Sequence, residues 1–392
     1  MSFSVCNNDI VLCSGENIVV YNIEKNEENI ITLPRLNNLQ ENNTHNNEEI
    51  EAFHTLMSVN FSKDGEYLAV CTNRKQLCLY KRRELEIVSN RCLVRAASKV
   101  CFTKSNDIVV ADKSGDAYLF STSKPMENGK LLLGHLSMLL DILVTSDEKY
   151  IITADRDEKI RVSKYPNCYN ISAYCLGHKK YVNNVVELPH QREILISCGG
   201  DGQFIFWNYK SGKEVYRFPF EHNLQDADVK KFEKLLEEMN VEESIAHFPV
   251  KQMQIDNIDN STSIISISFF CCTTVFIYSV KGTKDTNLTM NYIQEISIKE
   301  EPLECLLYKN RLWILTNVKL DVYKLKDNAF SKDEEMMGKI CKLNKVWEKL
   351  RSDSCDKTLF PILYKRKFDN VQEYQEKKKC RLNEKQSLEN FP

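Results

Sequence analysis

The chain has 392 residues, of which 42% are hydrophobic and 28% are charged, and its formal net charge is -2. This composition is that of a globular protein with a sizeable core, folded as one large all-β domain or as two ordinary domains. A near-neutral charge argues against a surface that binds nucleic acid over its whole extent, although a local basic patch stays open.

Several other classes of protein are disfavoured. The N-terminal stretch "MSFSVCNNDIVLCSG" has neither a basic region nor a long apolar run, so a secretory signal is not expected. The 15 Cys are odd in number and none has CxxC spacing, which favours reduced thiols in the core. The His residues are scattered and none pairs with Cys at ligand spacing, so no metal site is expected.

The first 120 residues already show a strand rhythm. The stretch "DIVLCSGENIVVYNI" reads as a hairpin, and residues 59–80 and 100–120 each read as strand, turn, strand, polar turn, strand. Residues 37–49, "NNLQENNTHNNEE", are Asn-rich and polar, which predicts a disordered loop between two such units.

Two copies of one pattern follow, and they begin at Gly134-His135 and Gly177-His178, 43 residues apart. Each copy reads as Gly-His, an apolar strand, a turn, a strand ending in Ser or Thr, a tight turn with Asp, and a further strand. This pattern resembles the WD40 repeat, whose period of about 40–45 residues describes one four-stranded propeller blade.

Particular side chains carry this resemblance. The second copy has all four family positions, at His178, Ser197, Asp201 and Trp207. In the family they form a hydrogen-bonded chain, which suits an indole N–H and a buried imidazole that both need partners. The first copy offers His135, Thr153 and Asp157, with Ser163 in place of the Trp. We therefore interpret these residues as structural and not as catalytic.

The rhythm continues after residue 250. The stretches "SIISISFFCCTTVFIYSV" and "ECLLYKNRLWILTNVKLDVYKL" alternate like strands, and the Ser and Thr in the first argue against a membrane helix. We expect an all-β fold over residues 1–330, a seven-bladed WD40 β-propeller whose blades start near residues 3, 52, 91, 132, 175, 246 and 289. Apolar residues at helical spacing in 226–240 predict a helical insertion at about 224–244. Residues 331–392 are predicted to be a helical, basic C-terminal extension.

Nothing in the chain predicts an enzyme. With only 12 Gly there is no G-x-G-x-x-G loop, and the "GGDG" that begins at Gly199 fits a turn within a blade. A non-catalytic role is therefore expected.

The first copy differs from the second by a dense set of charges in "TADRDEKIRVS". They are Asp155, Arg156, Glu158, Lys159 and Arg161, four in the hairpin turn and one on the next strand. The turn does not require them, since the second copy has Gly-Gly there. They form either a solvated hairpin with local ion pairs, worth about 0–1 kcal/mol each, or a contact surface that orients a protein partner.

Longer stretches carry a narrower resemblance. "GHLSMLLDILVTSDEKYIITADRDEKIRVSKYP", followed by "CLGHKKYVNNV", is similar to the WD-repeat non-catalytic subunit of the eukaryotic tRNA guanine-N7 methyltransferase, the Wuho family. "VVADKSGDAYLFS" and "LYKRKFDNVQEYQEKKKCRL" also resemble family segments. The close similarity covers about residues 100–215 and the tail.

The resemblance implies a heterodimer with a separate catalytic subunit. That subunit would bind S-adenosylmethionine and make 7-methylguanosine in tRNA, while this chain would hold no cofactor, stabilise the subunit and help to position the tRNA. The expected location is the nucleus, with the cytoplasm as a second location, and no membrane partner is expected. Carried over by position, Arg156, Lys159 and Arg161 would face acidic groups of the partner, with Asp155 and Glu158 orienting them.

The alternative from another class is a WD40 adaptor of a ubiquitin-ligase or chromatin complex that docks through the same turn.

The tail is basic in its own right. From 364 to 382 it has three acidic and seven basic residues: Lys365, Arg366, Lys367, Lys377, Lys378, Lys379 and Arg381. Such a helix could contact tRNA phosphates and add salt-sensitive affinity. A solvated helix and a nuclear-import signal are equally compatible with this composition.

Overall fold

The computed structural model describes residues 2–34, 56–72, 74–220, 226–238, 241, 243, 245–283, 287–351 and 360–364. The chain divides into two compact units. The first comprises Met1–Asn223 with His247–Lys357, and the second comprises Leu224–Ala246 with Thr358–Pro392. The Asn-rich segment 37–49 lies outside the described residues.

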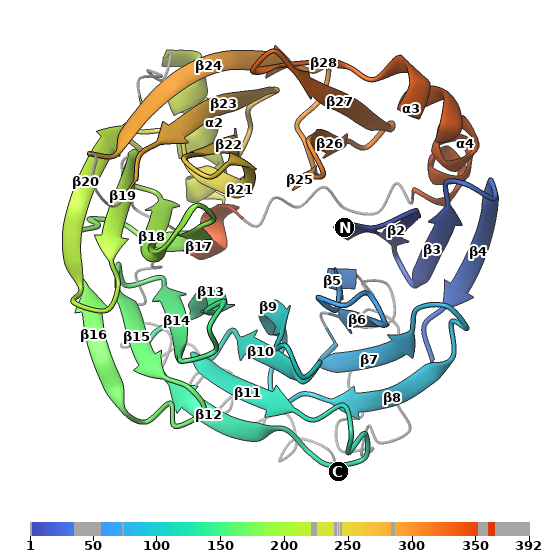
Figure 1. Cartoon of the computed structure of the whole chain (residues 1–392), viewed down its shortest axis with the longest axis horizontal. Coiled ribbons are helices and arrows are strands. Elements are labelled where there is room, and N and C mark those ends of the chain that lie inside the picture. Colours follow the sequence, from blue (N-terminus) through green and yellow to red (C-terminus); the bar gives the residue numbers. More distant parts are fainter. Residues whose placement is uncertain are drawn as a thin grey trace, which may run out of the picture. The chain divides into compact units, whose positions relative to one another are not determined.

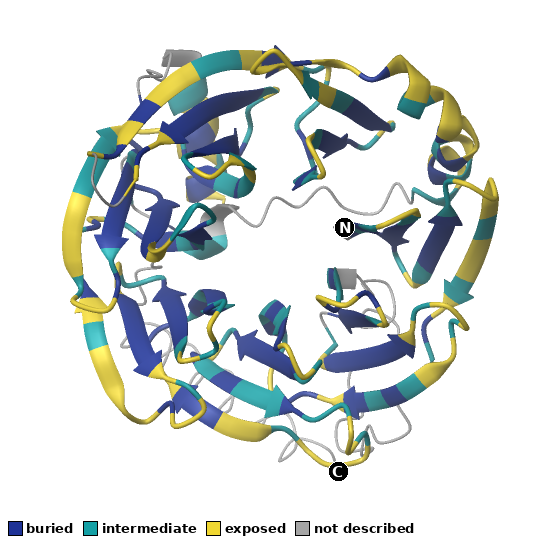
Figure 2. Ribbon diagram, viewed as in Figure 1, coloured by how far each residue is buried: buried dark blue, intermediate teal, exposed yellow. Residues whose placement is uncertain are grey.

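The first unit is a seven-bladed β-propeller, as the sequence predicts. Its seven described sheets are antiparallel, each is built from four strands that are consecutive in the chain, and they follow one another around a ring (Figure 1). The first strand of each blade lies innermost. In Figure 2 the second and third strands of the blades are mostly buried, while the outermost strands carry most of the exposed positions.

The first four blades comprise residues 2–175. Blade 1 contains β1 (Ser2–Cys6), β2 (Asp9–Ser14), β3 (Asn17–Asn22) and β4 (Glu27–Thr32). Blade 2 contains β5 (Leu56–Phe61), β6 (Tyr67–Thr72), β7 (Gln76–Lys81) and β8 (Ile87–Cys92). Blade 3 contains β9 (Ala97–Phe102), β10 (Ile108–Asp112), β11 (Asp116–Phe120) and β12 (Lys130–Gly134). Blade 4 contains β13 (Leu139–Val144), β14 (Tyr150–Asp155), β15 (Ile160–Lys164) and β16 (Ile171–Cys175).

The last three blades comprise residues 182–332, and the strands are longest in blades 5 and 6. Blade 5 contains β17 (Val182–Leu188), β18 (Gln191–Gly199), β19 (Gln203–Asn208) and β20 (Lys213–Pro219). Blade 6 contains β21 (Val250–Asp259), β22 (Thr262–Phe269), β23 (Thr274–Lys281) and β24 (Thr289–Ser297). Blade 7 contains β25 (Glu304–Tyr308), β26 (Arg311–Leu315), β27 (Leu320–Lys326) and β28 (Ala329–Lys332). The predicted starts near residues 91, 132 and 175 fall six or seven residues early, in the outer strand of the preceding blade. The predicted start of blade 7 near residue 289 is wrong, because that residue begins the outer strand of blade 6 and blade 7 begins only at Glu304.

The described helices are few and short. They are α2 (Asp226–Glu237), α3 (Glu334–Lys339), α4 (Cys341–Leu350) and the 3-10 turn η1 (Phe360–Leu363). The predicted helical insertion is α2, in which Phe232 and Leu236 are buried. None of the helices in the described ranges is both long and apolar enough to cross a membrane.

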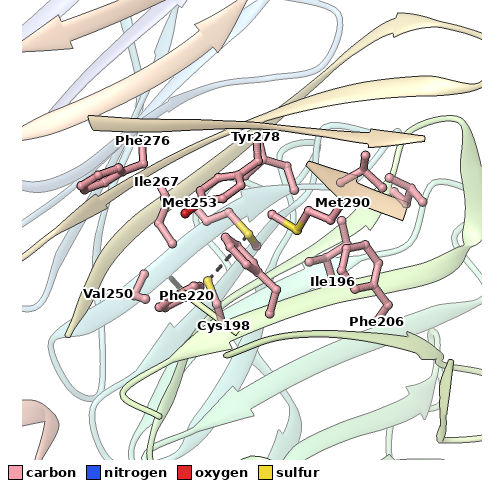
Figure 3. Close-up of a cluster of buried hydrophobic side chains, with 14 of the residues drawn as sticks. Ile196, Cys198, Phe206, Phe220, Val250, Met253, Ile267, Phe276, Tyr278 and Met290 are labelled. Carbon is pink, nitrogen blue, oxygen red and sulfur yellow. Dashed lines mark hydrogen bonds between the residues drawn. The ribbon is translucent and has the colours of Figure 1, made fainter. Parts of the chain in front are cut away.

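The propeller has no single hydrophobic core among its described residues, because the buried apolar side chains lie between neighbouring blades. Seven clusters of described residues fill the seven contacts between neighbouring blades. Figure 3 shows the one between blades 5 and 6, where Phe206 and Ile196 face Tyr278 and Met290. Each apolar strand therefore buries both faces, which explains why the strands read as apolar runs.

Polar side chains on the inner strands join neighbouring blades. Asp141 of β13 accepts a hydrogen bond from the Val185 N–H of β17 at 2.8 Å, and Glu304 of β25 accepts one from the Phe3 N–H of β1 at 2.9 Å. The second of these bonds closes the ring between blades 7 and 1.

The helices α3 and α4 reinforce the same seam. No described sheet combines strands from both ends of the chain. Instead, Leu343 and Trp347 are fully buried in the cluster that contains residues of blades 7 and 1. Trp347 Nε1 donates to Thr316 O of blade 7 at 3.1 Å, and the Ser14 hydroxyl of blade 1 donates to Leu350 O at 2.9 Å.

The cysteines that the structure describes are free thiols. Many are buried, and burial raises the pKa of the Cys175 thiol to about 12. A thiol of this kind stays protonated at neutral pH and is a poor nucleophile. In the described part of the chain, no group of three or more His, Cys, Asp or Glu could hold a metal ion.

Candidate protein-binding site

The structure brings the four blade-5 residues into one hydrogen-bonded chain. Trp207 Nε1 donates to the Ser197 hydroxyl at 2.8 Å, and the Ser197 oxygen lies 2.7 Å from His178 Nε2. His178 Nδ1 lies 2.9 Å from Asp201 Oδ2. Burial by itself would raise the pKa of Asp201, but hydrogen bonds from His178 and the Lys179 N–H hold it below its usual range. The chain ties the turn to the strands behind it and exposes no reactive group.

Blade 4 has a similar chain with a different acid. His135 Nε2 lies 2.8 Å from Thr153 Oγ1, and His135 Nδ1 lies 3.0 Å from Asp155 Oδ2. The assignment of Asp157 to this network is therefore wrong. Asp157 accepts instead from the Ser137 hydroxyl at 2.8 Å. The reason is that Asp155, the last residue of β14, is only 2% exposed and already lies against the imidazole.

Asp155 also organises the turn that follows it. Its Oδ1 accepts from the Asp157 N–H at 2.9 Å and from the Lys159 N–H at 3.0 Å. Glu158 has φ +71°, the same value as Gly202 at the equivalent place in blade 5. A non-glycine residue in this region is strained, so the surrounding bonds must hold it there. Asp155 therefore shapes the turn from inside and presents no carboxylate to the surface.

Arg161 lies behind the turn and is 9% exposed. Its Nε donates to the Ser163 hydroxyl at 2.9 Å. Its two terminal nitrogens donate to Gly134 O at 3.0 Å and to Cys168 O at 3.1 Å. Ser163 stands where blade 5 has Trp207, so the smaller side chain leaves room for the guanidinium. Arg161 thus has a structural role in this blade, and its contact with a partner stays a prediction.

The remaining charges of the turn face outward. Glu158 and Lys159 are exposed, Arg156 is partly exposed, and the Lys159 ammonium lies 3.4 Å from Asp157 O. The Arg156 Nε atom is buried and has no hydrogen-bond partner among the described residues. The turn therefore presents two cations and the Glu158 carboxylate, beside the half-buried Asp157, on a backbone that hydrogen bonds hold in place.

Comparisons with known proteins agree with this architecture. The family model described as the tRNA methyltransferase TRM82 WD40 domain matches residues 21–129 and 121–329. A curated relative from Xenopus laevis, a tRNA (guanine-N(7)-)-methyltransferase non-catalytic subunit, is 34% identical over 341 residues, covering 83% of this chain and 80% of the relative. This chain belongs to the family of tRNA guanine-N7 methyltransferase non-catalytic subunits.

Other members of this family match in the same way. The non-catalytic subunit wuho of Culex quinquefasciatus is 29% identical over 339 residues, which cover 84% of this chain and 76% of the relative. The corresponding human subunit is 41% identical over 162 residues, covering 41% of this chain and 39% of the relative.

Solved structures support the fold alone. A chain of the structure titled "Crystal Structure of Mitotic Checkpoint Complex" has a TM-score of 0.63 at 15% identity, covering 83% of this chain and 86% of that chain. A chain of "Structure of U3-55K" has a TM-score of 0.59 at 13% identity, covering 80% and 86%.

The basic tail lies outside the described residues. The seven residues predicted to contact tRNA all lie outside the described residues: Lys365, Arg366, Lys367, Lys377, Lys378, Lys379 and Arg381. Their role stays a prediction.

Two apolar residues beside the charged turn escaped the sequence reasoning. Leu136 follows the first Gly-His pair and is fully exposed, and Leu176 precedes the second pair and is 63% exposed. The available signal was an aliphatic residue in a short loop where no strand continues. That signal is weak, because single exposed aliphatic residues are common.

Proposed function

We propose that this chain binds and stabilises a separate S-adenosylmethionine-dependent subunit that forms 7-methylguanosine in tRNA, and that it helps to position the tRNA. Membership of a family of non-catalytic subunits supports a role beside a catalytic partner. In this proposal the chain needs no cofactor of its own, because S-adenosylmethionine binds to the partner. The complex works in the nucleus, and also in the cytoplasm.

The observation that carries the proposal is the blade-4 turn. Arg156, Glu158 and Lys159 are held on a rigid hairpin whose geometry blade 5 achieves with glycines. The fold does not need these charges, and the backbone that carries them is already ordered. Such an arrangement favours binding to a partner whose charges complement them. Binding to such a turn costs little ordering entropy.

The test is reconstitution with the catalytic methyltransferase subunit from the same organism. The two chains should co-purify one to one at micromolar concentration, and the mixture should form 7-methylguanosine in tRNA, measured by mass spectrometry of digested nucleosides. The propeller alone should form none. If the chains do not associate, or if the propeller adds nothing to the stability or activity of the other subunit, the proposal fails.

The tRNA part of the proposal has its own test. Removing residues 365–392 should weaken tRNA binding by the complex and flatten the dependence of log Kd on log salt concentration, because fewer phosphates would be contacted. The protein–protein Kd serves as the control and should not change. If the dependence of log Kd on log salt concentration did not change, the tail would not contact the tRNA phosphates.

A further inference from the structure

One face of the propeller is formed by the turns between second and third strands and by the loops that lead to the next blade. Backbone hydrogen bonds join these segments around the ring. The His135 N–H donates to Gly115 O at 2.8 Å, the Arg156 N–H to Met138 O at 3.0 Å, and the Gly200 N–H to Tyr181 O at 3.0 Å. We call this the turn face. The charged turn of blade 4 belongs to it.

The charge on the turn face is unevenly distributed. With the long connection from blade 5 to blade 6 that contains α2 left aside, the described turns and loops of blades 2–5 carry eight cations: Arg74, Lys75, Arg95, Lys113, Arg156, Lys159, Lys179 and Lys180. Only two carboxylates that are not buried lie among them, Asp157 and Glu158. Over blades 6, 7 and 1 the same segments carry two cations, Lys299 and Lys319, and three carboxylates, Glu16, Glu300 and Glu301. The first half of the face is therefore basic and the second is not.

The basic half also exposes aliphatic side chains in an ordered way. Three successive loops between blades each present one, namely Val94 at 61%, Leu136 fully exposed and Leu176 at 63%. They alternate around the ring with the cationic turns. Among the described residues on the other half of the face, Val318 is the one large aliphatic side chain of this kind, at 42%. A row of exposed aliphatic residues between ordered charges is typical of a protein interface.

We infer that the basic half of the turn face is the docking surface for an acidic segment of the catalytic subunit that also carries apolar side chains, with Val94, Leu136 and Leu176 as its apolar anchors. This inference rests on the proposed function and extends it from one turn to four blades. The excess of cations selects an acidic partner, and the surface is continuous with the blade-4 turn.

The aliphatic residues decide between a protein and an RNA occupant. If RNA bound here, the cations alone would be enough to bind its phosphates. RNA bases usually stack on aromatic rings or guanidinium planes and not on aliphatic side chains. Three exposed aliphatic side chains gain free energy only against apolar surface, which a folded protein segment supplies. The observations therefore favour the protein.

The experiment compares Leu136→Asp, Leu176→Asp and Val94→Asp with the matched control Val318→Asp, all in the full chain. Each of the first three should raise the Kd for the catalytic subunit at least tenfold, with the largest effect at Leu136, beside the charged turn. The control should leave the Kd unchanged. The melting temperature of the isolated chain should not change in any of the four, because the replaced side chains are exposed.

The outcomes separate the two proposals. If the unaltered chain does not bind the catalytic subunit, the proposed function fails and the inference fails with it. If the unaltered chain binds and all four variants bind equally well, the inference alone is overturned. If the variants keep the protein–protein Kd but weaken tRNA binding by the complex, the surface belongs to RNA, and the inference is overturned in that direction.

Discussion

Blade 4 closes the turn between its second and third strands with Arg156, Asp157 and Glu158, whereas blade 5 closes the same turn with Gly200, Asp201 and Gly202. Both blades place a His between a hydroxyl and a carboxylate behind the turn. Blade 5 adds a buried Trp, and blade 4 adds a buried Arg. One backbone geometry thus tolerates two very different sets of side chains.

The comparison separates what the fold needs from what it merely permits. The His networks of blades 4 and 5 belong to the fold, because each of them ties its turn to the strands behind it. Of these two blades only blade 4 carries outward charges in the turn, so the turn geometry itself does not explain them. Substitutions inside the two blades should therefore lower stability, while substitutions at the surface of blade 4 should change binding and leave stability alone.

The largest effect is expected at Trp207. Replacing it with Ala removes a large, fully buried side chain and a hydrogen bond to Ser197, so the free energy of unfolding should fall by about 3–5 kcal/mol in urea titration. Ser163→Ala at the equivalent place in blade 4 should lose only about 1 kcal/mol, the contribution of one hydrogen bond. Equal losses in the two blades would show that the Trp is not the anchor of blade 5.

The next effect concerns the Arg that accompanies Ser163. Arg161→Met keeps the length of the side chain but removes its donors to Ser163, Gly134 O and Cys168 O. The free energy of unfolding should fall by about 2–3 kcal/mol, measured in the same titration. Arg161→Lys should lose less, since it keeps the charge but not the three-way fork. If the Arg161→Met protein were as stable as the unaltered chain, the structural role of Arg161 would be contradicted, and the predicted contact with the partner would remain as its explanation.

A smaller and purely surface effect is expected from the charged turn. The double change Arg156→Glu and Lys159→Glu should raise the Kd for the catalytic subunit by about tenfold or more, because in the proposed complex it reverses two charges at the contact. The melting temperature of the isolated chain should not change. Lys299→Glu, on the non-basic half of the turn face, is the matched control. If it weakens binding as much, net charge and not position is what the partner senses.

The smallest effect is a pH dependence of the free energy of unfolding that arises from Asp201, the acid of the blade-5 hydrogen-bonded chain. The folded pKa of Asp201 lies below its usual value, so its ionised form stabilises the fold above a pH of about 4. That stabilisation is lost as the pH falls through the lower folded pKa. The difference in unfolding free energy between the unaltered chain and Asp201→Asn, about 1 kcal/mol at neutral pH, should therefore shrink toward pH 3. If this difference in unfolding free energy stayed constant with pH, the ionisation of Asp201 would not be its source.

The architecture could be predicted because its signals are local and repeated. Apolar runs separated by short polar turns recur through the chain, and the Gly-His pairs set the spacing of one blade. The four blade-5 residues follow a pattern in which each position has one physical role. Sequence alone therefore predicted both the propeller and the residues of that hydrogen-bonded chain.

The details of blade 4 depend on geometry that spacing does not encode. Asp155 and Asp157 are both close enough in sequence to serve His135, and the end of β14 decides between them. Arg161 looks like a surface charge until the space beside Ser163 and the carbonyl oxygens around it are known. The exposure of Leu136 likewise depends on how two blades meet, and its neighbours along the chain give only a weak signal of it.

The helices that seal blades 7 and 1 have a consequence for how the protein is made. The Phe3–Glu304 bond spans 301 positions and the Ser14–Leu350 bond spans 336, so the first strands to leave the ribosome find these partners only near the end of synthesis. Until then one side of blade 1 has no neighbour, and contacts this distant in sequence form slowly. A chain that stops before Trp347 would hold seven blades and still lack the side chain that fills the last gap between them.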